Sequence, residues 1–229
     1  MDEPPLLAQA DMLFLLAGQF EPPSVESLER FRNARAEVAS FLPLAGRRAH
    51  TLATSFLRAQ GALAQISLPA LAAEYERLFG VRAVCPIHET DFTVGANDAV
   101  RADIARAYAA FGMDVPEERN DRGDHLSFEL EFFAVLLVIL AGARTQSQPE
   151  AARVSEQAIE EFALAHVNTW VPVFGAALER ASRLAFYRHL ARLLGEAWRI
   201  IAADHGFGPG AAVVLPARAG PNRTLLRLH

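Results

Sequence analysis

The sequence predicts an all-α protein of about eight helices, because of its composition and its hydrophobic periodicity. Ala and Leu dominate a chain that is 52% hydrophobic, and this balance favours helix over sheet. Every long periodic segment has helical spacing, and no alternating Val/Ile/Thr-rich run is long enough to predict a strand. We therefore expect one helical domain at 1–205, or two helical subdomains joined by an acidic hinge at about 113–124. A Gly/Pro-rich tail follows at 206–229.

Prolines, glycines and capping residues divide the first half of the chain into five predicted helices. These helices cover about residues 4–19, 25–39, 44–66, 68–79 and 98–112. Ser24 and Asn97 are candidate N-caps, and Gly80 is a candidate C-cap. The loop at 81–96 is long for a compact domain, which is typical of a functional or a disordered segment. Its apolar residues favour an ordered loop.

The stretch 121–144 is the predicted central helix. Asp124 follows turn-forming residues and is the candidate N-cap. Residues 132–141 are wholly apolar, but a bilayer-spanning helix needs roughly 20 such residues. A helix that is apolar all round must be buried on every side. The sequence thus predicts a buried stem with a charged, exposed first turn that contains His125, Ser127, Glu129 and Glu131.

The second half of the chain is predicted to contain two further helices. One covers about 149–166, and the other is a long last helix that starts after Asn168 and Pro172 and ends near Asp204. Apolar residues repeat along one face of the last helix with helical period. They are Tyr187, Leu190, Leu194, Trp198 and Ile201.

Charge and cysteine content exclude several classes of function. The formal net charge is −5, which argues against a nucleic-acid partner. All the basic residues are Arg, so a Schiff-base lysine and a P-loop lysine are excluded. The single cysteine, Cys85, allows no intramolecular disulfide and is typical of a reducing compartment. The N-terminus is acidic, unlike a secretory signal. We expect a cytoplasmic protein without stable membrane insertion.

Two constellations could carry chemistry. Cys85, His88, Glu89 and Asp91 are residue types that zinc accepts, but structural zinc sites pair their motifs and there is no second cysteine. We therefore expect no metal and no cofactor, and a polar loop with local hydrogen bonds. Asp124 and His125, with Glu129 or Glu131, resemble half of an acid–base set. No nucleophile accompanies them in sequence, so we expect no catalytic residue.

Four blocks of sequence, in this order, resemble the redox-enzyme maturation chaperones of the TorD/DmsD/NarJ family. They are EYERLFG (74–80), PIHETDF (86–92), DHLSFELEFF (124–133), and HVNTWVPVFGAALERA with FYRHLARLL (166–194). The resemblance implies an all-helical, cytoplasmic chaperone without catalytic turnover. Such a chaperone binds the catalytic subunit of a molybdenum-cofactor enzyme, often at a twin-arginine leader peptide. It holds this client for cofactor insertion before export or assembly.

The resemblance also implies a client-binding site. The family's Tyr-x-x-Leu-Phe motif falls on Tyr75, Leu78 and Phe79, and its Pro-rich loop falls on 86–92. Its Glu-Pro-x-Asp-His hinge falls on 121–125, with Arg122 where proline is usual. The expected client-binding residues are Tyr75, Pro86, Ile87, His88, Glu89, Phe92, Asp121, Asp124 and His125.

The residues themselves fit such a partner and leave other functions open. Residues 114–131 hold seven acidic residues against two arginines, which suits a partner with a basic head and an apolar stretch. A hinge in this linker would allow a monomer or a domain-swapped homodimer. One alternative is a metal- or His-dependent hydrolase that uses Cys85, His88, Asp124 and His125. The other is a helical scaffold subunit held permanently in a larger complex.

Overall fold

The computed structural model describes residues 3–93, 97–114 and 123–208. Within these residues the chain is all-α, as predicted, and no β-strand forms. The α-helices are α1 (Glu3–Ala17), α2 (Val25–Asn33), α3 (Arg35–Phe41), α4 (Ala49–Leu63), α5 (Leu68–Phe79), α6 (Asn97–Ala110), α7 (Leu126–Thr145), α8 (Pro149–Phe162), α9 (Asn168–Ala181) and α10 (Ala185–Asp204). Shorter helical segments are η1 (Leu42–Arg48), η2 (Glu89–Asp91) and the π-helix η4 (Ala163–Val167).

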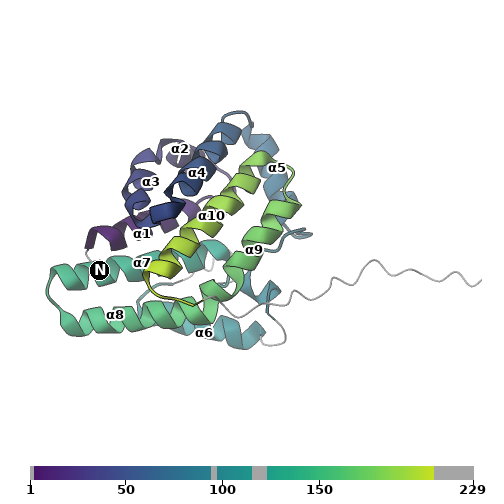
Figure 1. Ribbon diagram of the computed structural model, residues 1–229. Helices are drawn as coiled ribbons and strands as arrows, with labels where there is room; N and C mark the ends of the chain where they lie inside the picture. The colour runs from purple at the N-terminus through teal and green to yellow at the C-terminus, as the bar shows by residue number, and fades with distance from the viewer. Residues whose placement is uncertain (1–2, 94–96, 115–122, 209–229) are drawn as a thin grey trace, which may run out of the picture.

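Helix α7 lies at the centre of the packing. Helix α1 packs against one side of it and α8 against another, while α10 packs against α4 and α9 (Figure 1). By length and composition α7 could cross a membrane, but 72% of its apolar window is buried inside the protein. Burial on nearly every side explains why this helix can be apolar all round. The prediction of a central core helix is confirmed.

Local sequence explains several helix ends. The Ser24 side chain accepts from the Ser27 amide and starts α2 as predicted, in a capping box with Ser27. Gly80 ends α5, and its amide donates to the Glu76 carbonyl. A Cβ at position 80 would lie 2.5 Å from that carbonyl oxygen, so only glycine fits without a shift. The predicted C-cap is therefore confirmed, for a steric reason.

Three predicted helices are each divided in the structure. The segment predicted at 44–66 forms the end of η1 and then α4, with a non-helical conformation at Gly46. The segment predicted at 25–39 forms α2 and α3, which meet at Ala34. The predicted last helix forms α9 and α10, because the chain turns at Ser182. Pro172, expected before this helix, lies inside α9. The Glu74 carboxylate accepts a 2.6 Å hydrogen bond from the Arg183 amide at the break, a contact that only the tertiary fold supplies.

Parts of the predicted organisation fall on residues that the structure does not describe. Most of the expected hinge, including Asp121, lies in the segment 115–122. The expected tail lies outside the described residues from position 209 onward. The hinge and the exchange of segments around it therefore stay predictions.

Candidate functional site

The loop before η2 and the start of α7 are paired directly, although about 37 residues separate them in sequence. The Glu89 amide donates to the Asp124 carbonyl at 2.8 Å, and the Leu126 amide donates to the Ile87 carbonyl at 3.1 Å. These bonds form an isolated antiparallel bridge between His88 and His125. The other end of the loop is held to α5, where the Cys85 amide donates to the Leu78 carbonyl at 3.0 Å. The expectation of an ordered loop is confirmed for residues 81–93.

Asp124 does not cap α7, which corrects the sequence-based assignment. Its side chain is fully buried, and Oδ2 accepts from the Thr90 amide at 3.2 Å and from the Thr90 hydroxyl at 2.5 Å. The N-cap is His125, whose Nδ1 accepts from the Ser127 amide at 3.2 Å. The Ser127 hydroxyl donates in turn to the Glu21 carboxylate. Asp124 therefore ties η2 to α7, a role that depends on a loop distant in sequence.

Two buried glutamates lie beneath this bridge. Glu89 and Glu129 are 1% and 0% exposed. His166 Nδ1 lies 2.9 Å from Glu89 Oε2, and the Trp170 indole donates to Glu129 Oε2 at 2.9 Å. On the far side of the imidazole, His166 Nε2 lies 3.4 Å from a carboxylate oxygen of Asp103. Buried side chains from η2, α7, η4 and α9 thus form a polar cluster in the core, and Asp103 of α6 contacts it from the surface.

Burial raises the pKa of two side chains in this cluster, Glu129 and Tyr108. The pKa of Glu129 is raised well above its usual value, first by burial and then by the nearby Glu89 carboxylate, while the Trp170 hydrogen bond opposes the shift. Burial also raises the pKa of Tyr108, whose hydroxyl donates to the Gly123 carbonyl at 2.9 Å. A protonated Glu129 carries no charge into the core. The first turn of α7 is therefore not the charged, exposed surface that the sequence predicted.

The structure brings most of the predicted client-binding residues together but buries many of them. Ile87 and Phe92 are 2% and 3% exposed, and the Phe92 ring packs 5.3 Å from Trp170. The His88 side chain is 22% exposed and its ring lies 5.2 Å from His125. Pro86 is half-buried. The accessible part of the site is thus centred on Pro86 and His88.

Tyr75 lies apart from this junction. Its hydroxyl donates to the Phe20 carbonyl at 3.1 Å, and its ring packs 5.1 Å from Phe79. Phe20 precedes Glu21, which accepts from Ser127 at the start of α7. Tyr75 is therefore connected to the site through this short segment, while Asp121 lies outside the described residues.

Sequence reasoning missed several members of the cluster. They are Glu21, Thr90, Asp103, Tyr108, His166 and Trp170. His166 and Trp170 are four residues apart in a largely apolar segment. Glu129 likewise lies among apolar residues in α7. Polar groups in apolar helical segments need buried partners, and that pattern is the available signal. It does not identify the partners, because they come from five different elements.

The structure buries two of the residues that the hydrolase alternative requires, Cys85 and Asp124. The Cys85 residue is 1% exposed, so its thiol is not open to a substrate. Asp124 is fully buried as well, and its Oδ2 accepts two hydrogen bonds from Thr90. Among the described residues, no group of three or more His, Cys, Asp and Glu side chains is placed to hold a metal ion.

Asp124→Ala is expected to lower the free energy of unfolding by about 1–3 kcal/mol, because it leaves the Thr90 amide and hydroxyl without their buried acceptor. Asp124→Asn keeps an acceptor oxygen and is expected to lose less. Urea unfolding of the two variants measures the difference. Equal losses for both would show that the Thr90 contacts do not stabilise the bridge.

Comparisons with known proteins agree with this fold. The family model described as nitrate reductase delta subunit matches residues 42–176. The chaperone protein TorD of Vibrio parahaemolyticus serotype O3:K6 (strain RIMD 2210633) is 26% identical over 98 residues, which are 43% of this chain and 44% of that protein. The match thus spans less than half the length of this relative.

A solved structure has the same fold. It is a crystal structure of a proposed redox enzyme maturation protein from Archaeoglobus fulgidus, which superposes with a TM-score of 0.53 at 20% identity. The superposition covers 83% of this chain and 93% of that one. The family match includes the bridge between the loop at 86–92 and α7, and it covers more than half of the 229 residues. The chain therefore belongs to the nitrate reductase delta subunit family, the TorD/NarJ family of redox-enzyme maturation chaperones.

Proposed function

We propose that this protein is a cytoplasmic chaperone for a molybdenum-cofactor oxidoreductase. It binds the catalytic subunit, or its twin-arginine leader peptide, and holds it for cofactor insertion without catalytic turnover. It does so as a monomer or as a homodimer that exchanges segments around 113–124. Membership of the family and the likeness to TorD support this proposal.

One observation carries the choice of site. Two of the sequence blocks that resemble the family, 86–92 and 124–133, are far apart in the chain but are bonded backbone to backbone in the fold. The buried cluster beneath them fixes their relative position through Asp124, Glu89 and Glu129. The solvent-facing side of this junction presents Pro86 and His88. A client that bridges the two blocks would contact these residues first.

The charges at this junction favour a basic client. Asp91 is 38% exposed beside His88, and Glu131 is half-buried on α7. Elsewhere, Asp114 is exposed after the end of α6. The buried Asp124 and Glu129 do not contribute to the exposed acidic surface. A basic leader should be steered by the remaining acids and by the net charge of −5. Its association rate should therefore fall as salt is added, since exposed charges are screened.

His88→Ala is expected to weaken client binding by about 1–2 kcal/mol, roughly 5- to 30-fold in Kd, if the ring contacts the client. The melting temperature should change little, since the ring is partly exposed and lies outside the buried cluster. Calorimetric titration of a twin-arginine leader peptide into each protein gives the affinity.

His50→Ala is the matched control, because His50 is exposed on α4, away from the bridge. It should bind the leader as the parent does. Leader binding by His88→Ala at the parent's affinity would exclude this surface as the site. A pull-down from the native organism tests the chaperone function itself. If it captured no redox-enzyme subunit, that function would be rejected.

A further inference from the structure

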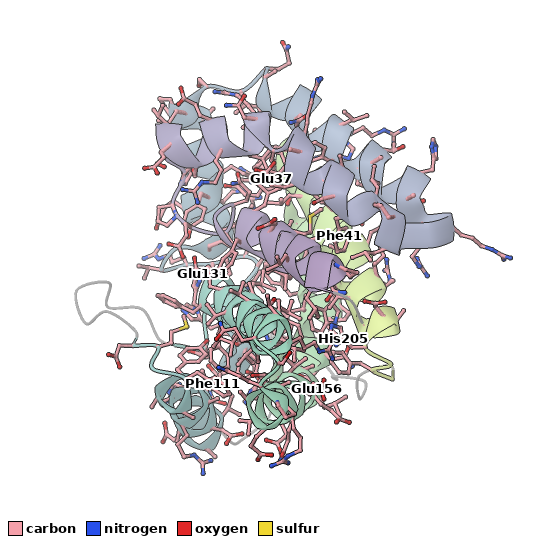
Figure 2. The ribbon with its side chains drawn as sticks, turned by 90° about the vertical axis from the view of Figure 1, so that its left-hand side faces the viewer. Glu37, Phe41, Phe111, Glu131, Glu156 and His205 are labelled. Carbon is pink, nitrogen blue, oxygen red and sulfur yellow. The ribbon has the colours of Figure 1, made fainter. Side chains whose placement is uncertain are left out.

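A second surface, distinct from the bridge, lies between α6 and α8. It is a groove of about 300 Å³ whose floor contains the side chains of Phe111, Phe132 and Phe162. Phe111, labelled in Figure 2, lies on the side of α6 that faces α7, and its ring centroid is 6.0 Å from that of Phe132. Alanines line the walls, and two of them, Ala110 and Ala165, are exposed. The groove is therefore apolar and open to solvent.

Acidic side chains lie at the edge of this groove. Asp103 and Glu161 line it and are both exposed. Asp103 forms a 2.6 Å ion pair with Arg106, and its other oxygen lies 3.4 Å from His166 Nε2. The Glu161 carboxylate accepts from the side-chain amide Nε2 of Gln157 at 2.8 Å, and none of the described contacts pairs it with a basic side chain. The edge at Glu161 can thus receive a cation.

The described part of the chain ends against α9, the helix that follows the groove-lining segment η4. The Gly208 carbonyl accepts from the Asn168 side chain at 2.7 Å, and Asn168 is two residues from His166, which lines the groove. The sequence continues for 21 residues after Gly208. An extended chain of that length reaches on the order of 60 Å, so distance does not limit access to the groove.

The composition of this segment complements the groove. Residues 209–229 contain three arginines, Arg218, Arg223 and Arg227, and no acidic residue. Leucines 225, 226 and 228 flank Arg227. Leucines can bury apolar area against the phenyl rings, while an arginine at the edge can pair with a carboxylate.

We propose that residues 223–229 dock in the groove between α6 and α8 of the same chain, with their leucines on the phenyl rings and Arg227 beside Glu161. Tethering favours this occupant over a free peptide of similar chemistry, because a short linker gives an effective concentration in the millimolar range. The proposal does not depend on the identity of a client. It assigns a binding site to a surface that the chaperone proposal leaves unused.

Hydrogen exchange of the full chain tests the docking. Amides of residues 223–229 should exchange about tenfold more slowly than in a free peptide of the same sequence, which corresponds to a docked fraction of roughly 90%. Ala158→Trp places an indole in the groove and should return exchange to the free-peptide rate. Ala176→Trp is the control, because Ala176 lines a different cavity of about 280 Å³ beside α10, and it should leave the slow exchange unchanged.

A second pair of variants tests the charge contact without filling the groove. Glu161→Gln should raise the exchange rate of residues 223–229 several-fold, whereas Glu160→Gln, exposed on the same helix, should not. Free-peptide rates in the parent chain, or slow exchange that survives Ala158→Trp in a folded protein, would overturn the proposal. Slowing that increases with protein concentration would place the segment on a second copy and would also overturn it.

Discussion

Trp170→Ala is expected to lower the free energy of unfolding by about 3–5 kcal/mol, the largest loss that we predict for a single substitution. Trp170 is fully buried, and its ring lies 5.3 Å from Phe92 and 5.6 Å from Phe174. Its removal leaves a cavity and also takes the indole donor from Glu129. Chemical denaturation followed by circular dichroism measures the loss.

Trp170→Phe separates the two contributions. Phenylalanine keeps most of the ring but has no N–H, so the expected loss of about 1–3 kcal/mol reflects mainly the unpaired acceptor on Glu129. Phe14→Ala is the control, because the Phe14 side chain is 36% exposed on α1 and its loss should cost much less. If Trp170→Ala cost no more than Phe14→Ala, the central packing described above would be wrong.

Glu129→Gln is expected to reduce the decline of stability with rising pH. In the folded protein the pKa of Glu129 is raised above its usual value of 4.5, by burial and by Glu89. Above about pH 4.5 the folded state therefore binds more protons than the unfolded state, and the free energy of unfolding falls as pH rises. Below that pH both states are protonated and this contribution is fully present. One group contributes a slope of at most about 1.4 kcal/mol per pH unit.

The measurement is urea unfolding of parent and variant between pH 5 and 8. Glutamine keeps an oxygen that can accept from Trp170 but does not titrate, so the stability of Glu129→Gln relative to the parent should increase with pH. Glu160→Gln, on the exposed side of α8, should follow the parent at every pH. Parallel curves for parent and Glu129→Gln would show that Glu129 is not protonated in the folded protein.

Trp170 and Glu129 belong to the buried network that holds the two family motifs, 86–92 and 124–133, in place. The loop and the start of α7 meet through two backbone hydrogen bonds, but the position of the loop depends on Asp124, Glu89 and their partners beneath it. Buried polar groups must be satisfied, so this network allows few alternative arrangements of the loop. Changes at Trp170 or Glu129 should therefore reach the proposed client surface at His88 indirectly, through the stability of the junction.

The sequence by itself determined the helical class and the positions of most helices. Periodicity and caps are local properties, which is why Ser24, Gly80 and the start of α8 at Pro149 could be predicted. The same reasoning identified α7 as the core helix, because ten consecutive apolar residues must be buried wherever they lie. The resemblance in four blocks then predicted the family, and the match to residues 42–176 confirms it.

Only the tertiary structure decided how the polar residues of the site are used. Asp124 has the residue type of an N-cap, but the approach of Thr90 from a distant loop gives its carboxylate other donors, and His125 caps the helix instead. The sequence predicts that Glu129 belongs to a charged, exposed turn. In the fold, Glu89 and Trp170 surround its carboxyl group, and burial raises the pKa of Glu129. Burial and long-range hydrogen bonds depend on which segments are in tertiary contact, and a local sequence pattern does not specify those contacts.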